Sequence, residues 1–215
     1  MAGTSESHPE RRRAGCGGIV LCGGKSTRMG QPKLTLPFGP EVMLQRVIRI
    51  LGEVVSPVVV VAARNQELPE LPDDVLICRD EEEDLGPLAG LAVGLAALEG
   101  KVECAFACGC DVPLLQPEFV RAVIDRLGDH DAAVPKEEDF YHPLAGVYRT
   151  SLVPRILTIV RERRLRPLYL IESVDAVDIP VESLRSVDPD LDSLVNTNTP
   201  EAYEAALQKA GVSEG

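Results

Sequence analysis

The stretch LCGGKSTRMGQPK, residues 21–33, contains three glycines and three cations but no carboxylate. The rest of the chain has the opposite character, with 34 Asp and Glu against 22 Lys and Arg and a net charge of −12. A carboxylate inside this loop would compete with an anionic ligand for the same cations. The composition therefore indicates a small, locally positive pocket, whereas the overall charge argues against a nucleic-acid partner.

The residues around the loop are suited to phosphate. Residues 18–22, GIVLC, read as a buried strand, and Gly23 and Gly24 then let the backbone turn with its N–H groups inward. Arg28 offers a fork for two oxygens and Lys33 a flexible point charge. Ile19 stands where a Walker loop ending in GKS needs glycine, and no G-x-G-x-x-G follows the strand. The loop is therefore either a phosphate-binding loop of a third type, different from the Walker and dinucleotide-binding loops, or a plain turn.

Short apolar runs alternate with helical patterns along the chain. This alternation predicts an α/β fold, a three-layer α/β/α sandwich around a mostly parallel, Rossmann-like sheet. Ligands of such sheets gather at the carboxyl ends of the strands, where Asp111 also lies. Within one helix, Gly90 and Gly94 leave a smooth face for a strand or ligand. The expected strands are 18–22, 58–62, 74–78, 104–110, 131–135 and 142–149, and the expected helices are 41–51, 86–98, 117–128, 151–163 and 200–210.

Residues 1–15 read as a disordered tail and residues 16–212 as a single domain. No apolar run approaches the roughly 18 residues of a membrane span, and we expect a cytoplasmic protein. The run RERRLRP, residues 161–167, offers cations to an anionic ligand or forms an exposed helix face. Nothing in the sequence indicates the oligomeric state.

The six cysteines are scattered through apolar segments. The cluster CAFACGC matches no zinc spacing, although Cys104, Cys108 and Cys110 would share one face of a strand. Buried cysteines behave as small hydrophobic residues. We therefore expect neither a metal site nor a disulfide among them.

The motif L-x-G-G-x-S/T-x-R-M-G-x-x-K, followed in order by four others, resembles the molybdenum cofactor guanylyltransferase family. That family belongs to the nucleotidyltransferases with a glycosyltransferase-A-like sheet. The first motif is highly specific, and the set spans nearly all of the chain after residue 17. The other four motifs are GPLAG at 86–90, CDVPLL at 110–115, HPLAGVYR at 142–149 and VNTNTPE at 195–201.

The resemblance implies roles for residues of the first loop and of the central strands. Leu21, Cys22, Gly23 and Gly24 correspond to the turn that meets the nucleotide, and Gly86 belongs to the same binding site. Lys33 matches the phosphate-binding lysine and acts with Arg28. Asp111 matches the aspartate that holds Mg²⁺, with a helix cap as its structural alternative.

Roles for the remaining residues also come from the resemblance. Asp80 falls where the family has a nucleotide-binding aspartate, or it is one acid of a solvated acidic run. Asn196 or Asn198 matches the asparagines that approach the phosphates, and both are assigned with His142 to the acceptor side. Asn198 as the start of the last helix and His142 as a structural residue before Pro143 stay open as alternatives.

The implied reaction transfers GMP from GTP to the terminal phosphate of molybdopterin bearing molybdenum and releases pyrophosphate, with Mg²⁺ as cofactor. The guanine-using relatives read LAGG in the first motif, and LCGG follows them with Cys22 in place of Ala. Three alternatives remain: CTP as donor, a different acceptor, and a non-catalytic nucleotide-binding relative.

Overall fold

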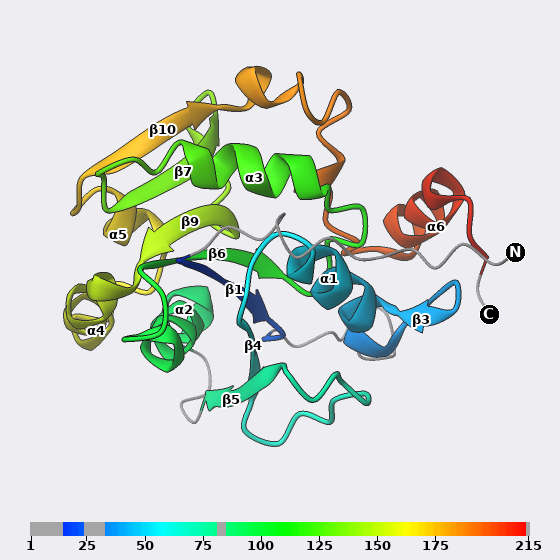
Figure 1. The fold of residues 1–215 in the computed structure, drawn as a ribbon, viewed down its shortest axis with the longest axis horizontal. Helices are drawn as coiled ribbons and strands as arrows, with labels where there is room; N and C mark the ends of the chain where they lie inside the picture. Colours follow the sequence, from blue (N-terminus) through cyan, green and yellow to red (C-terminus); the bar gives the residue numbers. More distant parts are fainter. Residues whose placement is uncertain (1–14, 24–32, 81–84, 214–215) are drawn as a thin grey trace, which may run out of the picture.

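The computed structural model describes residues 15–23, 33–80 and 85–213, and their backbone is organised around one eight-stranded sheet. Seven strands follow the order β10-β7-β9-β6-β1-β4-β5, and β8 pairs with β7 (Figure 1). The strands are β1 (Cys16–Leu21), β4 (Val58–Ala63), β5 (Leu76–Asp80), β6 (Cys104–Gly109), β7 (Ala132–Glu137), β8 (Phe140–Tyr141), β9 (Ala145–Arg149) and β10 (Ala176–Pro180).

The centre of the sheet consists of β1 with β6 on one side and β4 on the other, all parallel. Every residue of β1 and β6 is buried, which accords with their continuous apolar sequences. In the ladder, Leu21 lies opposite Gly109 of β6 and Val61 of β4. The carboxyl ends of the three strands therefore meet at one edge of the sheet.

The expectation of a mostly parallel sheet is confirmed, with one reversal. Strand β9 runs antiparallel to both β6 and β7, so that β7 and its parallel neighbour β10 again run in the direction of β1. Only residues 138–139 separate β7 from β8, and both β8 and β9 pair antiparallel with β7. A connection this short cannot make the crossover that a parallel pair requires, so the chain turns back before β8 and continues in that direction into β9.

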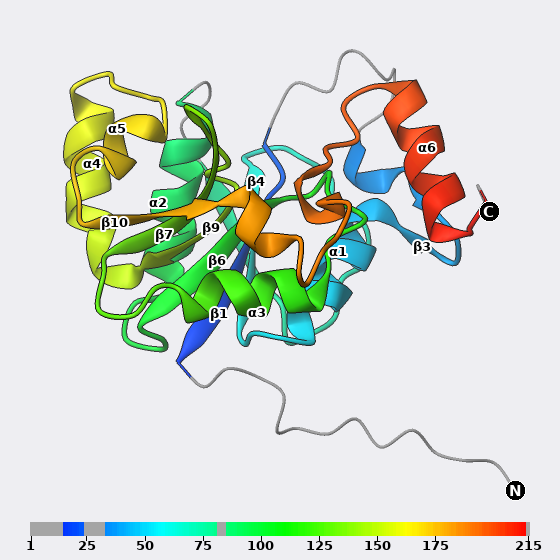
Figure 2. The same cartoon turned by 90° about the horizontal axis from the view of Figure 1, so that it is seen from above.

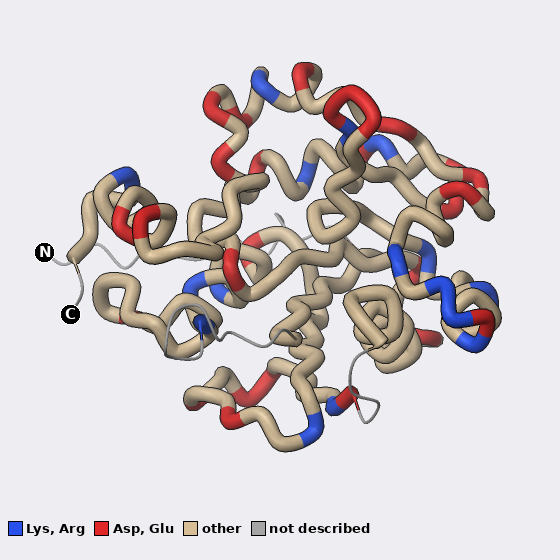
Figure 3. Tube along the Cα trace, turned by 180° about the vertical axis from the view of Figure 1, so that it is seen from behind, with Lys and Arg blue, Asp and Glu red and all other residues tan. Residues whose placement is uncertain are grey.

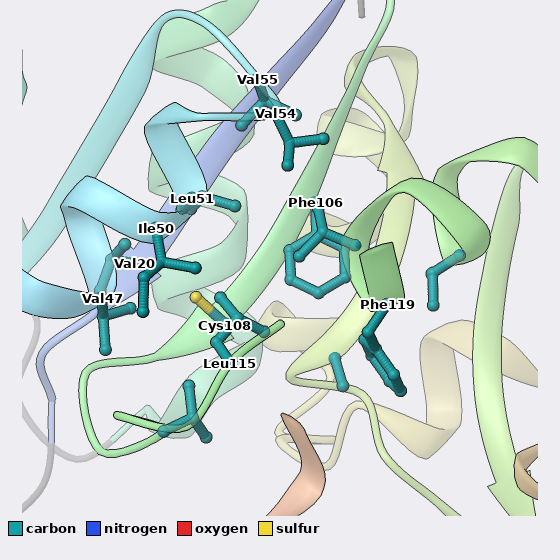
Figure 4. Close-up of a cluster of buried hydrophobic side chains, with 14 of the residues drawn as sticks. Val20, Val47, Ile50, Leu51, Val54, Val55, Phe106, Cys108, Leu115 and Phe119 are labelled. Carbon is teal, nitrogen blue, oxygen red and sulfur yellow. The ribbon is translucent and has the colours of Figure 1, made fainter. Parts of the chain in front are cut away.

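Helices cover both faces, as the three-layer prediction requires. On one face α1 (Met43–Gly52) and α3 (Pro117–Asp125) pack in the cluster that holds Phe106 and Cys108 (Figure 4). On the other face α2 (Gly86–Leu98) packs with α4 (Val153–Arg161) and the short α5 (Leu168–Ile171). Helix α2 lies directly on β1, because Gly90 and Gly94 admit the side chains of Leu21 and Ile19. The smooth face that these two glycines leave on α2 therefore contacts strand β1.

The last helix, α6 (Pro200–Ala210), ends the fold beside a small hairpin. Thr199 caps it by accepting from the N–H of Ala202, and Gly211 at φ +66° follows its last turn, as predicted. The hairpin consists of β2 (Pro37–Phe38) and β3 (Glu41–Val42), and Phe38 meets Tyr203 edge to face. Figure 2 shows α6 and this hairpin together at the end of the molecule opposite α4.

Several predicted boundaries were wrong. The strand predicted at 74–78 occupies 76–80, and the helix predicted from residue 41 begins at Met43 because 41–42 belong to β3. Helix α4 begins at Val153, since Pro154 fits a first helical turn. Hairpin β2–β3, β8, β10 and α5 were missed. In the described part of the chain there are also four short 3-10 helices: η2 (Lys33–Thr35), η3 (Thr150–Leu152), η4 (Val181–Leu184) and η5 (Asp192–Leu194).

Across the described ranges, no helix combines the length and apolar character that crossing a membrane requires. Of the predicted tail, all but Gly15 lies outside the described residues.

The packing of α2 on β1 predicts opposite effects for two helical glycines. A Cβ at Gly94 would approach Ile19 Cγ2 to 2.7 Å, whereas a Cβ at Gly52 meets nothing within 4 Å. Helix propensity favours Ala over Gly by about 1 kcal/mol, but overpacking a core costs about 1–3 kcal/mol. We expect Gly94→Ala to lower the free energy of unfolding and Gly52→Ala to raise it slightly, as measured by urea denaturation. Equal stabilisation by both would contradict this account of the helix–strand contact.

Candidate active site

The site is built where β1 and β6 end. The N–H of Cys110 donates to the carbonyl of Leu21 at 3.1 Å, and the N–H of Cys22 donates to the carbonyl of Val61 at 2.8 Å. The residues that follow, Gly23 and Asp111, therefore leave the sheet at the same edge. With respect to the described residues the space beside Gly23 is open, because a Cβ there would meet none of their atoms within 4 Å.

Three chain segments distant in sequence bring their side chains together at this edge. The Lys33 ammonium, at the start of η2, lies 3.5 Å from Oδ2 of Asp111 and donates to Oδ1 of Asn198. The Lys33 and Asp111 side chains are 18% and 21% exposed, so both remain within reach of a ligand. The structure thus brings together three of the residues that the sequence assigned to phosphate, metal and acceptor.

Thr197 holds the last of these segments in place and was missed by the sequence analysis. The carbonyl of Asp111 accepts from the Thr197 N–H at 2.9 Å and from its hydroxyl at 3.1 Å. Thr197 is fully buried, whereas its neighbours Asn196 and Asn198 are exposed. The position of Thr197 between two asparagines of VNTNTPE was the available signal.

Gly109 is a second residue that the sequence analysis missed. A Cβ built on this residue would collide with Oδ1 of Asp111, so the carboxylate occupies the space that a side chain at 109 would need. The glycine immediately before CDVPLL was its signal in the sequence.

Two predicted site residues, Gly24 and Arg28, lie outside the described residues. Their roles stay predictions.

The predicted nucleotide-binding residues Asp80 and Gly86 lie on the β5 side of the site. Asp80 is the last residue of β5, two strands from β1 in the sheet order, and pairs with Ala63 in the ladder. Gly86 begins α2 with φ +70°, a conformation that favours glycine.

Gln66 ties the end of β4 to the first loop. Its amide nitrogen donates to the carbonyl of Cys22 at 2.8 Å, and its amide oxygen accepts from the Ala63 N–H at 3.1 Å. Arg79 donates to the Gln66 carbonyl at 2.6 Å. These bonds fix the backbone of Cys22 relative to the strand that carries Asp80.

His142 lies on the other side of Asp111, because β9 neighbours β6 on the side away from β1. Its backbone N–H donates to the Pro135 carbonyl at 2.9 Å, which places it in the turn before β9. Its buried Nε2 makes no hydrogen bond within the described part of the chain and lies 3.9 Å from Oε2 of Glu137. Burial lowers the pKa of His142 below its ordinary value, so the ring is neutral near pH 7.

The cysteines are free thiols, and Cys104, Cys108 and Cys110 belong to one core cluster, as the shared strand face predicted. A hydrogen bond with Cys110 and burial raise the pKa of Cys22, and burial raises that of Cys108. Both thiols therefore stay protonated and are poor nucleophiles. Within the described ranges, no group of three or more His, Cys, Asp or Glu residues is placed to hold a metal ion.

The basic run 161–167 forms part of an exposed surface at the end of α4 (Figure 3). Arg164 stacks over the ring of Tyr169, with its guanidinium carbon 4.2 Å from the ring centroid. The carbonyl of Leu165 lies near Gly86, so this run reaches the amino end of α2.

Comparison with protein families identifies residues 18–177 as a MobA-like NTP transferase domain. The chain is 34% identical over 214 residues to the probable molybdenum cofactor guanylyltransferase of Methanosarcina mazei, with 94% of each chain covered. It is 40% identical over 195 residues to the protein of the same name from Mycobacterium bovis BCG Pasteur, with 89% of this chain and 92% of the relative covered.

Solved structures share the fold. The molybdopterin-guanine dinucleotide biosynthesis protein A of Archaeoglobus fulgidus superposes with a TM-score of 0.73 at 23% identity, covering 91% of this chain and 98% of that one. A cytidylyltransferase for 2-C-methyl-D-erythritol 4-phosphate from Thermus thermophilus gives 0.66 at 14% identity, covering 91% and 98%. Rv0371c of Mycobacterium tuberculosis, solved as a complex with manganese, gives 0.60 at 16% identity, covering 91% and 99%.

The family model and the two relatives place the chain among the nucleotidyltransferase enzymes, and the Lys33–Asp111 contact lies beyond the central strands of their shared fold. The family match spans most of the chain, and both relatives exceed 30% identity. The chain belongs to the MobA-like NTP transferase family.

The crowding of Asp111 against Gly109 predicts that Gly109→Ala impairs nucleotidyl transfer while the protein still folds. The added methyl group would force the carboxylate to rotate away from Lys33. We expect kcat to fall about tenfold or more, with a urea midpoint within a few tenths of a molar of wild type. Gly52→Ala is the steric control, because Gly52 has no assigned role in the site and its Cβ would meet no atom of the described residues within 4 Å. Wild-type turnover in Gly109→Ala would show that this orientation of the carboxylate is not required.

Proposed function

We propose that the protein transfers GMP from GTP to the terminal phosphate of molybdenum-bearing molybdopterin and releases pyrophosphate. The convergence of Lys33, Asp111 and Asn198 beyond the central strands carries this proposal. The names of the relatives support the choice of donor and acceptor.

The chemistry is a substitution at the α-phosphorus of GTP. The attacking oxygen belongs to a phosphate that is already anionic near neutral pH, because its second ionisation has a pKa of about 6. Such a nucleophile needs no general base, and the protonated Cys22 and Cys108 supply none. The protein's task is to hold two anions together and to neutralise the charge that gathers in the transition state.

Lys33 is placed for that neutralisation. Its ammonium already contacts a carboxylate and an amide oxygen, and a triphosphate entering beside Gly23 would give it phosphate oxygens as further acceptors. We assign the same role to Arg28 and to the backbone of Gly24. Asn198 keeps the lysine directed at the site, and Asn196 is assigned with it to the acceptor phosphate.

Asp111 is the residue that would hold Mg²⁺. Its carboxylate is a hard oxygen donor, is partly exposed and leaves the sheet beside the open space at Gly23, which fits a magnesium ion with one protein ligand. When bound, Mg²⁺ supplies positive charge to phosphate oxygens and so makes pyrophosphate a better leaving group.

Guanine is assigned to the β4–β5 side of the site. Asp80 offers a carboxylate that can accept from the N1–H and amino group of guanine, and Gln66 holds the Cys22 backbone rigid nearby. His142 is assigned to the acceptor, since it lies on the opposite side of Asp111. The free cysteines favour a reducing compartment, and we place the reaction in the cytoplasm.

The decisive test is a panel of nucleoside triphosphates. The protein is incubated with GTP, CTP, ATP or UTP together with Mg²⁺ and molybdenum-bearing molybdopterin, and products are detected by mass. We expect the guanine dinucleotide and pyrophosphate in equal amounts from GTP. The Asp80→Ala variant should show a smaller preference for GTP over CTP. A cytosine dinucleotide as main product would identify a cytidylyltransferase, and GTP binding without product would identify a non-catalytic relative.

Loss of either charged group at the centre should slow the reaction. We expect Lys33→Ala and Asp111→Ala to lower kcat on the order of 10²–10³-fold, as for other groups that stabilise transition-state charge. Lys101→Ala is the matched control, because Lys101 precedes β6 and so lies at the opposite edge of the sheet. Near wild-type rates in both site variants would refute the assigned roles.

A further inference from the structure

The β7–β8 hairpin carries an aromatic side chain whose exposure sets it apart. Phe140 is 64% exposed, more than any other large apolar side chain of the described residues. The chain has four phenylalanines, and the other three, Phe38, Phe106 and Phe119, are completely buried. Leaving a phenyl ring in water forfeits the roughly 1.5–3 kcal/mol that its burial would contribute, so a partner for this ring is worth seeking.

The hairpin stands at the edge of the sheet that holds the site. Strand β7 runs in the direction of β1, so its carboxyl end and the turn into β8 lie at the same edge as Gly23 and Asp111. Along the sheet, β7 is two strands from β6, on the side away from β5. The strand that ends in Asp80 and the hairpin that carries Phe140 therefore flank Asp111 from opposite sides.

The hairpin is held in one arrangement by its other side chains. The Tyr141 hydroxyl donates to Asp178 of β10 at 2.9 Å, and Lys136 pairs with the same carboxylate at 2.8 Å. Phe140 and His142, on either side of Tyr141, point to the opposite face, where their rings meet edge to face at 4.9 Å. The phenyl ring is thus fixed in orientation but largely uncovered, as a stacking surface requires.

We propose that Phe140, positioned by His142, forms the wall on which the pterin ring of the acceptor stacks. The inference rests on the proposed function, which gives the acceptor a pterin ring and a terminal phosphate. Phe140 lies on β8, which pairs with β7 on the side of β9, because β10 occupies the other side of β7. The line of β8 is therefore one strand spacing, or about 5 Å, from the line of β6, which makes a ring at Phe140 and a phosphate at Asp111 neighbours along this edge of the sheet.

Geometry argues against guanine as the occupant. Phe140 lies on β8, in line with β9, and four strand spacings separate β9 from β5, which is about 19 Å. A base held by Asp80 therefore cannot also stack on Phe140.

The test uses the full-length protein and two readouts. Quenching of the intrinsic fluorescence of free pterin measures ring binding without turnover, and steady-state kinetics measure KM for the molybdopterin acceptor and for GTP. For Phe140→Ala we expect pterin binding to weaken and the acceptor KM to rise about tenfold, as when one base–aromatic stack is lost. The KM for GTP and kcat should stay unchanged.

Two further variants make the result specific. Phe140→Tyr keeps the ring and should restore both values to within about twofold of wild type. Leu157→Ala, which removes another exposed apolar side chain on α4, should have no effect. The inference is overturned if Phe140→Ala leaves pterin binding and acceptor KM unchanged, or if it raises the KM for GTP instead.

Failure of the proposed function would look different. The wild-type protein could form no dinucleotide and still quench pterin fluorescence, with the quenching lost in Phe140→Ala. That result would refute the proposed reaction but support Phe140 as a pterin-binding residue.

Discussion

The pairing of β1 with β6 is the constraint on which the site depends. One backbone hydrogen bond, from Cys110 to Leu21, places the ends of these strands in register, so that a permissive loop and a carboxylate emerge together. The strands are buried on both faces, by α2 on one and by α1 and α3 on the other. This closely packed, aliphatic core therefore holds Gly23 and Asp111, which follow the two strands, in fixed positions at its rim.

Around that rim the two halves of the sheet carry different residues of the site. The β4–β5 side carries Asp80 and the Gln66 bridge to Cys22, while the β9–β7 side carries His142 and the hairpin. Asp111 lies between them. The reaction that we propose joins two large anionic substrates, and it would need two separate binding regions with the Lys33–Asp111 pair between them.

The sequence predicted the parallel core because runs such as 58–62 are continuously β-branched, which is typical of strands buried on both faces. It did not predict the reversal at β9, because a buried strand has the same apolar pattern whether it runs parallel or antiparallel to its neighbours. The direction of the strand depends on the length of the connection before it. Strand β10 escaped notice because it holds a charged Asp178 and ends in proline. Lys33 and Asp111 were found through motifs. Thr197 and Gly109 lie in or beside those motifs, but their roles depend on contacts with Asp111 that the motifs do not specify.

The tether between Thr197 and Asp111 has a consequence for biosynthesis. It recruits the segment that precedes α6 into the centre of the molecule, and α6 packs in turn on the hairpin that follows Lys33. Helix α6 thus supports residues that precede it by about 90 to 170 positions. A nascent polypeptide can complete its parallel core before α6 is made, yet it gains an assembled reaction centre only once α6 has been synthesised.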